Sequence, residues 1–121
     1  METDNTIKID SSCCKMKTVK GYCPKPLESA SGFLSKKWAI SVIITIGNFK
    51  RLRFNDLRDK IENITAKTLT ERLKELEKEK IVSRQFYHEI PPRVEYSLTN
   101  KGQALMHSLL PMIHWAEHRN K

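Results

Sequence analysis

A chain of 121 residues is long enough for one domain with a modest hydrophobic core. Its 22 lysine and arginine residues against 14 acidic residues give a formal net charge of +8, which favours a polyanionic partner, either a nucleic acid or an anionic membrane surface. No apolar run is long enough to span a bilayer, and residues 1–12 lack the apolar core of a signal peptide, so we expect a cytoplasmic protein without a membrane segment.

The N-terminal region shows no helical or strand period. Residues 1–20 mix charges and hydroxyl groups with few large apolar side chains, so we expect a mobile leader there, followed by one domain over residues 21–121. All three cysteines, Cys13, Cys14 and Cys23, lie near this end, and their odd number does not make a disulfide framework. We therefore expect free thiols in a reducing compartment.

Two apolar segments follow the leader. A short helix is expected over residues 27–33, because two prolines just before it stand where a helix can begin but cannot continue. The segment 36–48 is ambiguous, because its β-branched side chains alternate as in a strand while apolar side chains at four-residue intervals also fit a buried helix. Either element would end at Gly47 and Asn48.

A clearer helical pattern comes next, as two helices with a break between them. Apolar spacing predicts a short helix over residues 56–61 capped by Asn55, and a longer helix over residues 65–79 capped by Thr65. The longer helix is expected to bury Leu69, Leu73 and Leu76 and to turn Lys67, Thr70, Glu71, Lys74 and Lys78 toward solvent. This pattern is typical of a helix-turn-helix.

A hairpin is predicted after the second helix. Its arms, residues 81–89 and 94–98, flank Pro91 and Pro92, and these prolines belong at the tip because proline cannot donate to a sheet ladder. A helix-turn-helix followed by a two-stranded hairpin is the order of a winged helix, whose second helix enters the major groove of DNA while the hairpin lies along the backbone. Arg93 then stands where a phosphate or a narrow minor groove could be met.

The last predicted helix is capped by Thr99 and is apolar on one side. Its apolar side chains are Leu105, Leu109, Leu110, Met112, Ile113 and Ala116. Packing in the core or against a second copy is the favoured interpretation of such a face. Trp38, Met106, Leu110, Ile113 and Trp115 could instead line a ligand pocket at a dimer junction.

Three histidines share the opposite side of this helix. His114 and His118 have the spacing of a metal-binding pair, and His107 lies two turns before them. We see no carboxylate or cysteine in register with the pair, so we interpret the histidines as a solvated stripe and expect no metal site.

Several motifs together resemble a known family. The stretches "YCPKPLE", "KKWAISVI" and "TLTERLKELE", followed by "IPPRVEYSLTNKG", are similar to the HxlR-type winged-helix transcription regulators, which are related to the MarR group. The resemblance runs from Tyr22 to Trp115. It implies an α+β, mainly helical fold with a helix at residues 36–46, and a homodimer joined through its N-terminal and C-terminal helices that binds a roughly palindromic operator.

The resemblance also singles out one thiol. Cys23, followed by Pro24, matches the position at which several family members sense electrophiles or oxidants, whereas Cys13 and Cys14 have no counterpart. A helix start and neighbouring lysines would favour the thiolate form of Cys23. Two interpretations stay open: a reactive switch, or an inert thiol packed at the dimer interface.

The expected DNA contacts come from the second helix of the helix-turn-helix and from its neighbours. Side chains of that helix would read base edges, while Arg53 and Arg93 would position the phosphate backbone. Glu71 would be offset by pairing with Lys67 or Lys74 inside the helix. The full set is Arg53, Thr65, Ala66, Lys67, Thr68, Thr70, Glu71, Lys74 and Arg93.

These patterns predict a sequence-specific transcription regulator that binds double-stranded DNA as a homodimer. Its switch would be the Cys23 thiol, meeting an oxidant or electrophile, or a bound small molecule. The alternative is a winged helix that binds an acidic protein and has no operator. We find no glycine-rich phosphate loop, nucleophile elbow or paired carboxylates, so we expect no enzymatic activity and no cofactor.

Overall fold

The computed structural model describes residues 22–120, and the chain divides into two compact units, residues 1–35 and 36–121. The predicted leader, residues 1–20, lies outside the described residues. In the first unit, the described residues form helix α1 (Lys25–Leu34). It begins two residues before the predicted helix because Pro26 fits the first turn, where an amide has no partner inside the helix.

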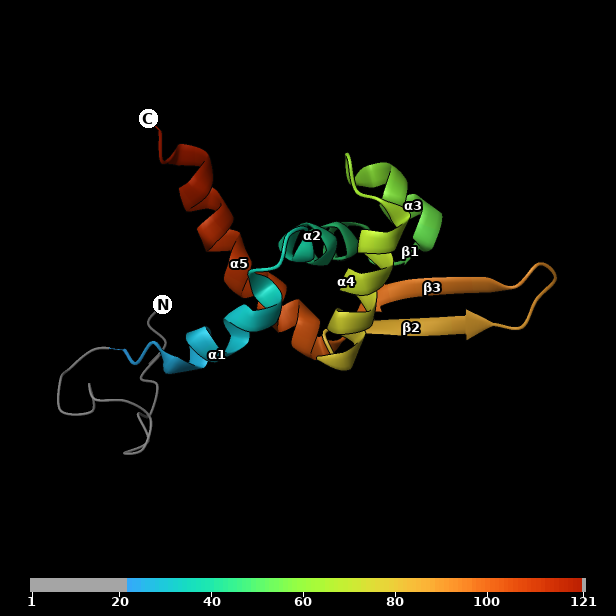
Figure 1. Ribbon diagram of the computed structural model, residues 1–121, viewed down its shortest axis with the longest axis horizontal. Helices are drawn as coiled ribbons and strands as arrows, with labels where there is room; N and C mark the ends of the chain where they lie inside the picture. The colour runs from blue at the N-terminus through green and yellow to red at the C-terminus, as the bar shows by residue number, and fades with distance from the viewer. Residues whose placement is uncertain (1–21, 121) are drawn as a thin grey trace. The chain divides into compact units, whose positions relative to one another are not determined.

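The second unit is a winged helix. Its elements, in chain order, are α2 (Ala39–Phe49), β1 (Leu52–Arg53), α3 (Phe54–Lys60), α4 (Ala66–Lys78), β2 (Val82–Tyr87), β3 (Arg93–Leu98) and α5 (Asn100–His118). The strands form an antiparallel three-stranded sheet in the order β1-β3-β2. Figure 1 shows the β2–β3 hairpin extending away from α3 and α4. The predicted α+β, mainly helical winged helix-turn-helix is confirmed.

Helix α2 occupies the centre of the second unit. It packs against α3, α4, α5 and β3, and Val42, Ile43 and Ile46 are fully buried in it. A helix surrounded in this way needs apolar side chains on nearly every side, so it lacks the polar stripe by which amphipathic helices are found. The ambiguity of residues 36–48 is thereby resolved as a helix.

The end predicted for this helix is wrong. Helix α2 continues through Gly47 and Asn48 to Phe49. A Cβ atom on Gly47 would lie 1.9 Å from Met106 Sδ and 3.1 Å from Leu98 Cδ1. The glycine therefore allows α2 to approach α5 and β3 closely, and it does not end the helix.

Helix α3 begins earlier than predicted. Its N-cap is Arg53 and not Asn55, which lies inside the helix, and the Arg53 amide donates to Asp56 Oδ2 at 3.4 Å. Arg53 is also the last residue of β1, a strand that the sequence did not reveal. A strand of two residues is too short to show alternation, so the pairing of Arg53 with Glu95 of β3 carries no sequence signal.

The predicted caps of the next two helices are confirmed, and one hairpin arm is shorter than expected. Thr65 accepts a hydrogen bond from the Thr68 amide at 3.1 Å, and Thr99 accepts one from the Gly102 amide at 3.0 Å. The first arm ends at Tyr87, because the Glu89 amide turns back to the Tyr87 carbonyl at 2.9 Å and leaves the ladder.

The C-terminal half of α5 is largely uncovered. Leu109 is buried, but Leu110, Met112 and Trp115 are 44%, 52% and 67% exposed. Among the described residues, the predicted apolar face is thus covered only in part. Large exposed apolar side chains in one region mark a surface that binds a partner.

Candidate nucleic-acid interface

The polar side of α4 is exposed as predicted. Leu69, Leu73 and Leu76 are buried beneath it. Lys67, Thr70, Glu71, Lys74 and Lys78 are all exposed on the other side. Helix α4, which is 13 residues long, therefore has one polar side in solvent. The leucines on its other side hold it on the core.

The four predicted residues at the start of α4 that are not charged hold its first turn together by hydrogen bonds. The Thr65 hydroxyl donates to Thr68 Oγ1 at 3.0 Å, and the Thr70 hydroxyl donates to the Ala66 carbonyl at 2.8 Å. Thr65 and Thr70 are exposed, while Ala66 and Thr68 are half-buried. These bonds fix the first turn, and the positive end of the helix dipole there favours a phosphate.

Glu71 does not pair as expected. Its Oε1 lies 3.8 Å from Arg72 Nη2, and among residues 22–120 no ion pair joins it to Lys67 or Lys74. The prediction of pairing within the helix is therefore correct in kind but wrong in partner. Lys67 and Lys74 keep their full charge on the exposed side of α4.

A network of charges holds the flank of α4 nearest Arg72. Glu75 binds Lys36 and also accepts from Arg72 Nη1 at 2.6 Å. The hydrogen bond from Lys36 lowers the pKa of Glu75 below its ordinary value, and Arg72 adds to this effect, while partial burial opposes it. The positive charges of Lys36 and Arg72 are thereby compensated inside the protein.

Basic side chains also surround α3. Lys50, Arg51, Arg53 and Arg58 are exposed, and none of them enters an ion pair within the described part of the chain. Arg53 stands where β1 passes into α3. These charges are free to meet an anion, as the sequence predicted for Arg53.

The wing arginine singled out from the sequence is held by two carboxylates. Arg93 Nη2 lies 3.3 Å from Glu89 Oε2, and its Nε lies 3.4 Å from Glu95 Oε2. The guanidinium also stacks 4.1 Å above the Tyr87 ring. The two carboxylates together offset the charge of Arg93.

A second wing arginine was missed. Arg84 of β2 is exposed and shares a groove of about 370 Å³ with Thr70 and Lys74 of α4, over a floor that includes Tyr96. Strand alternation could have found it, because Arg84 lies two residues after the buried Val82 and so points to the face that the helices cover. This groove joins the hairpin to the polar side of α4.

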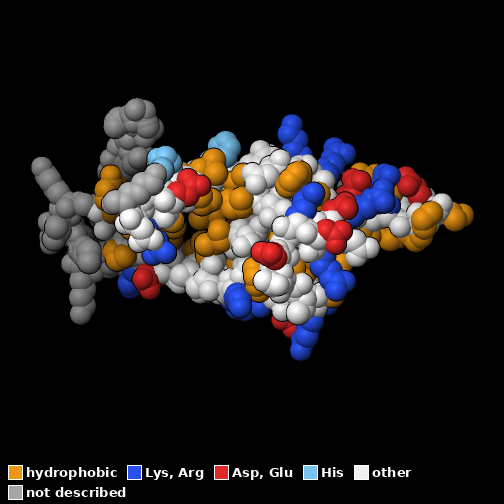
Figure 2. Space-filling model, turned by 90° about the horizontal axis from the view of Figure 1, so that it is seen from above, with side chains coloured by type: hydrophobic (Ala, Val, Ile, Leu, Met, Phe, Trp, Pro, Cys, Tyr) orange, Lys and Arg blue, Asp and Glu red, His pale blue; other side chains and the backbone are white. Residues whose placement is uncertain are grey.

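The far end of the hairpin is apolar. Ile90 is fully exposed at the tip, beside Pro91 and Pro92, which are exposed as well. Figure 2 shows a hydrophobic patch at the far end of the hairpin, with basic and acidic side chains next to it. The predicted place of the prolines is confirmed.

An exposed helix with free cations, preceded by a second helix and followed by a hairpin, is the arrangement of a DNA-binding winged helix. The family model of the HxlR-like helix-turn-helix matches residues 33–121. The chain belongs to this family. The resemblance stated from its motifs is thus confirmed, and the protein is a DNA-binding transcriptional regulator.

This HxlR-like regulator is similar to several proteins that are named as regulators. The transcriptional regulator YvaP of Bacillus subtilis is 40% identical over 94 residues, which are 78% of this chain and 85% of the relative. The solved structure of reduced YodB from the same species is 40% identical with a TM-score of 0.70, over 80% of this chain and 93% of that one. The redox regulator HypR in its reduced form is 36% identical with a TM-score of 0.73, over 79% and 94%.

Cys23 of this regulator is buried. Its side chain is 4% exposed and stands two residues before α1. Both interpretations of the thiol, reactive switch and inert packing, stay predictions. Cys13 and Cys14 lie outside the described residues.

The residues expected to line one ligand pocket do not come together: three of them lie in two separate pockets, and Ile113 and Trp115 line neither of these two. Met106 and Leu110 line a cavity of about 510 Å³ between α2, β3 and α5, which also receives Lys50 and Arg51. Trp38 lies instead in a separate depression of about 490 Å³.

Among residues 22–120 no helix combines the length and the apolar character needed to cross a bilayer.

The expectation that the histidines have no carboxylate in register is wrong. Glu117 brings its carboxylate to His114 and His118, and the three ligand atoms all lie within 4.8 Å of one another. Glu117 lies three residues after His114 in the sequence, and side chains at this spacing are neighbours on a helix. The prediction failed because it considered only the stripe formed by the histidines.

Proposed function

We propose that this HxlR-like regulator binds a roughly palindromic operator as a homodimer, with α4 in the major groove and the β2–β3 hairpin on the flanking backbone. The observation that carries the proposal is that some basic side chains of the protein are paired with carboxylates, whereas those on the exposed side of α4 are not. Lys36, Arg72 and Arg93 are neutralised by carboxylates of the same chain. Lys67 and Lys74, on the exposed side of α4, have no such partner in the described part of the chain.

Within the proposal, base contacts come from the outward side of α4 and phosphate contacts come from around it. Lys67, Thr70, Glu71 and Lys74 face the base edges, while Thr65, Ala66 and Thr68 form the helix start that meets a phosphate. Arg53 reaches the backbone on the α3 side. Arg84 makes the contact on the hairpin side, because its charge is not offset, and Arg93 mainly stiffens the hairpin.

The uncovered half of α5 supplies the dimer contact in this proposal. Leu110, Met112 and Trp115 are exposed in the single chain, and a second copy would bury them. Two copies related by a two-fold axis would address half-sites about 34–36 Å apart. A protein acting on DNA in this way works in the cytoplasm of its cell.

The signal that switches the regulator is proposed to act through Cys23. Support comes from its position before α1 and from the similarity to HypR, a protein described as a redox regulator in oxidised and reduced forms. If Cys23 is the switch, an oxidant weakens operator binding by the native chain and leaves a Cys23→Ser variant unaffected. Equal binding by oxidised and reduced native protein would leave the α2–α5 cavity as the place for a small-molecule effector.

Selection of binding sites from a random duplex pool tests the proposal, because it requires no choice of operator sequence beforehand. The purified full-length chain is expected to enrich one sequence with two inverted half-sites about one helical turn apart. Enrichment of no sequence, together with tight binding to an acidic protein partner, would support the interaction-module alternative and contradict operator recognition.

A further inference from the structure

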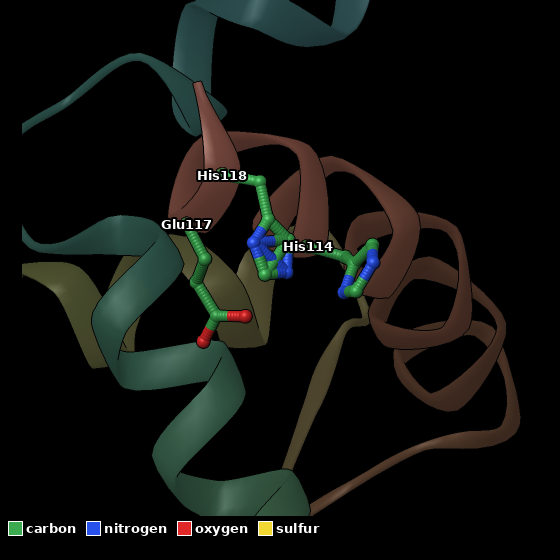
Figure 3. Close-up of side chains that lie close together, drawn as sticks. All are labelled: His114, Glu117 and His118. Atoms are coloured by element: carbon green, nitrogen blue, oxygen red, sulfur yellow. The ribbon is translucent and has the colours of Figure 1, made fainter. Parts of the chain in front are cut away.

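The last turns of α5 gather two imidazoles and one carboxylate. Glu117 and His118 follow His114 by three and four residues, the spacings at which side chains are neighbours of His114 on the helix surface. The two imidazole rings lie 4.4 Å apart between centroids at 79°. Figure 3 shows the Glu117 carboxylate beside them, with all three side chains projecting from the end of the same helix.

We propose that His114, Glu117 and His118 bind a divalent transition-metal ion of the zinc class. Each residue offers one ligand atom, and the three atoms lie within 4.8 Å of one another. Ligand atoms around a tetrahedral zinc ion, each about 2.1 Å from it, are separated by about 3.4 Å. All three side chains are exposed, so rotation about their own bonds closes this difference without any movement of the backbone.

The ligand chemistry selects the ion. Imidazole nitrogen binds Zn²⁺, Ni²⁺ and Cu²⁺ well, whereas Mg²⁺ and Ca²⁺ prefer sites built wholly from oxygen. The Glu117 carboxylate offsets part of the ion's charge, and no ion pair in the described part of the chain engages it. Three ligands from one helix leave the fourth position to water.

The site binds an ion and performs no reaction. The letters from His114 to His118 follow the pattern H-x-x-E-H of certain zinc peptidases, in which the glutamate acts as a base. Here every ligand lies on the exposed end of α5. A metal bound between residues four apart links one helical turn to the next, so it stabilises the uncovered half of α5.

Zinc titration by calorimetry tests the site on the untagged full-length chain. The native protein is expected to bind one more zinc ion per chain than His114→Ala or His118→Ala. Cysteine thiols also bind zinc, but they are the same in every variant, so only the difference reports on this site. Glu117→Gln should weaken that binding by about tenfold, which corresponds to about 1.4 kcal/mol.

The matched control is His107→Ala, which removes an exposed histidine of the same helix from outside the cluster. It should keep the full zinc stoichiometry. Thermal unfolding gives a second readout, because zinc should raise the melting temperature of the native chain and of the control more than that of His118→Ala. Equal stoichiometry and equal shifts in all variants would overturn the proposal, and undiminished binding by Glu117→Gln would overturn its third ligand.

Discussion

At the scale of single residues, the cations of this regulator differ in how far the chain itself compensates them. Arg93 was the most conspicuous basic residue of the hairpin in the sequence, yet it lies between Glu89 and Glu95. Arg84 was not among the residues predicted to bind DNA, yet it is exposed and lines the same groove as Lys74. The positions of lysine and arginine in the sequence therefore predict the basic surface only roughly. Which of these side chains are paired with a carboxylate depends on strand register and on side-chain rotamers.

The two wing arginines should respond differently to salt. Each phosphate contact releases condensed counterions and adds about 0.9 to the slope of log affinity against log salt. Arg84→Ala should therefore reduce the slope of operator binding by about 0.9, whereas Arg93→Ala should leave it nearly unchanged. Fluorescence anisotropy across a salt series measures both, and the opposite order would show that Arg93 makes the backbone contact.

The charge network on α4 predicts a dependence of stability on pH. The pKa of Glu75 is lowered in the folded chain, mainly by its hydrogen bond to Lys36. The folded carboxylate therefore stabilises the protein at neutral pH, and this contribution is lost as the pH falls through the lowered pKa. Glu75→Gln should reduce the free energy of unfolding at pH 7 by less than about 1 kcal/mol, because the pair lies near the surface.

Urea unfolding of both proteins checks this expectation. The difference between the native chain and the variant should shrink as the pH is lowered from neutral into the acid range, where Glu75 of the native chain takes up a proton. A difference that stayed constant with pH would assign the effect of the substitution to packing and not to charge.

At the scale of elements, the sequence predicted those whose signal is local. Helix α4 was placed within one residue at each end, because the Thr65 cap and the leucine stripe are both visible in the letters. Helix α2 was not separable from a strand, since its burial on most sides removes the amphipathic period. Gly47 was wrongly predicted to end the helix. A glycine is needed there because Met106, which is far away in the sequence, leaves no room for a side chain.

The candidate site was predictable to the same degree. The exposed side of α4 follows from its period, so its long polar side chains are exposed as predicted, whereas Ala66 and Thr68 are half-buried. Partners across elements do not follow, which is why the Lys36–Glu75 pair and the groove at Arg84 were found only in the structure. Strand β1 was missed for a related reason, because its two residues form a strand only by pairing with β3.

Two glycines make a matched test of helix packing. A Cβ atom on Gly102 of α5 would lie 2.2 Å from the Ile81 carbonyl oxygen, whereas one on Gly32 of α1 would meet nothing within 4 Å. Gly102→Ala should therefore lower the free energy of unfolding by about 1–3 kcal/mol, because backbone must shift. Gly32→Ala should be neutral or stabilise by up to about 1 kcal/mol through helix propensity.

Thermal or urea unfolding followed by circular dichroism distinguishes these outcomes. No loss of stability in Gly102→Ala would show that the close approach of α5 to Ile81 does not govern the packing of this helix. A loss in Gly32→Ala would contradict the open space around that glycine.

At the scale of the whole molecule, the proposed regulator requires a second copy. One chain leaves Leu110, Met112 and Trp115 largely in solvent, although a small domain gains most of its stability from apolar burial. The proposed dimer would bury these side chains, and its two α4 helices would have to address successive turns of DNA.

Replacing these side chains should shift the chain toward the monomer. Leu110→Glu combined with Trp115→Ala removes apolar surface and adds a charge, so the mass measured by light scattering should fall from that of two chains to that of one. Phe86→Ala, which removes an exposed aromatic ring from the hairpin, is the control and should stay dimeric. A variant that remained fully dimeric would place the interface elsewhere.

The central claim is that the exposed side of α4 recognises the operator, and a titration of the selected duplex tests it most directly. The double variant Lys67→Ala, Lys74→Ala should lose most of the preference of the native chain for this duplex over a scrambled one. Lys101→Ala removes one positive charge near the end of α4, where Lys101 Nζ donates to the Glu79 carbonyl at 3.1 Å, and should keep that preference. Full preference in the double variant would contradict recognition by α4.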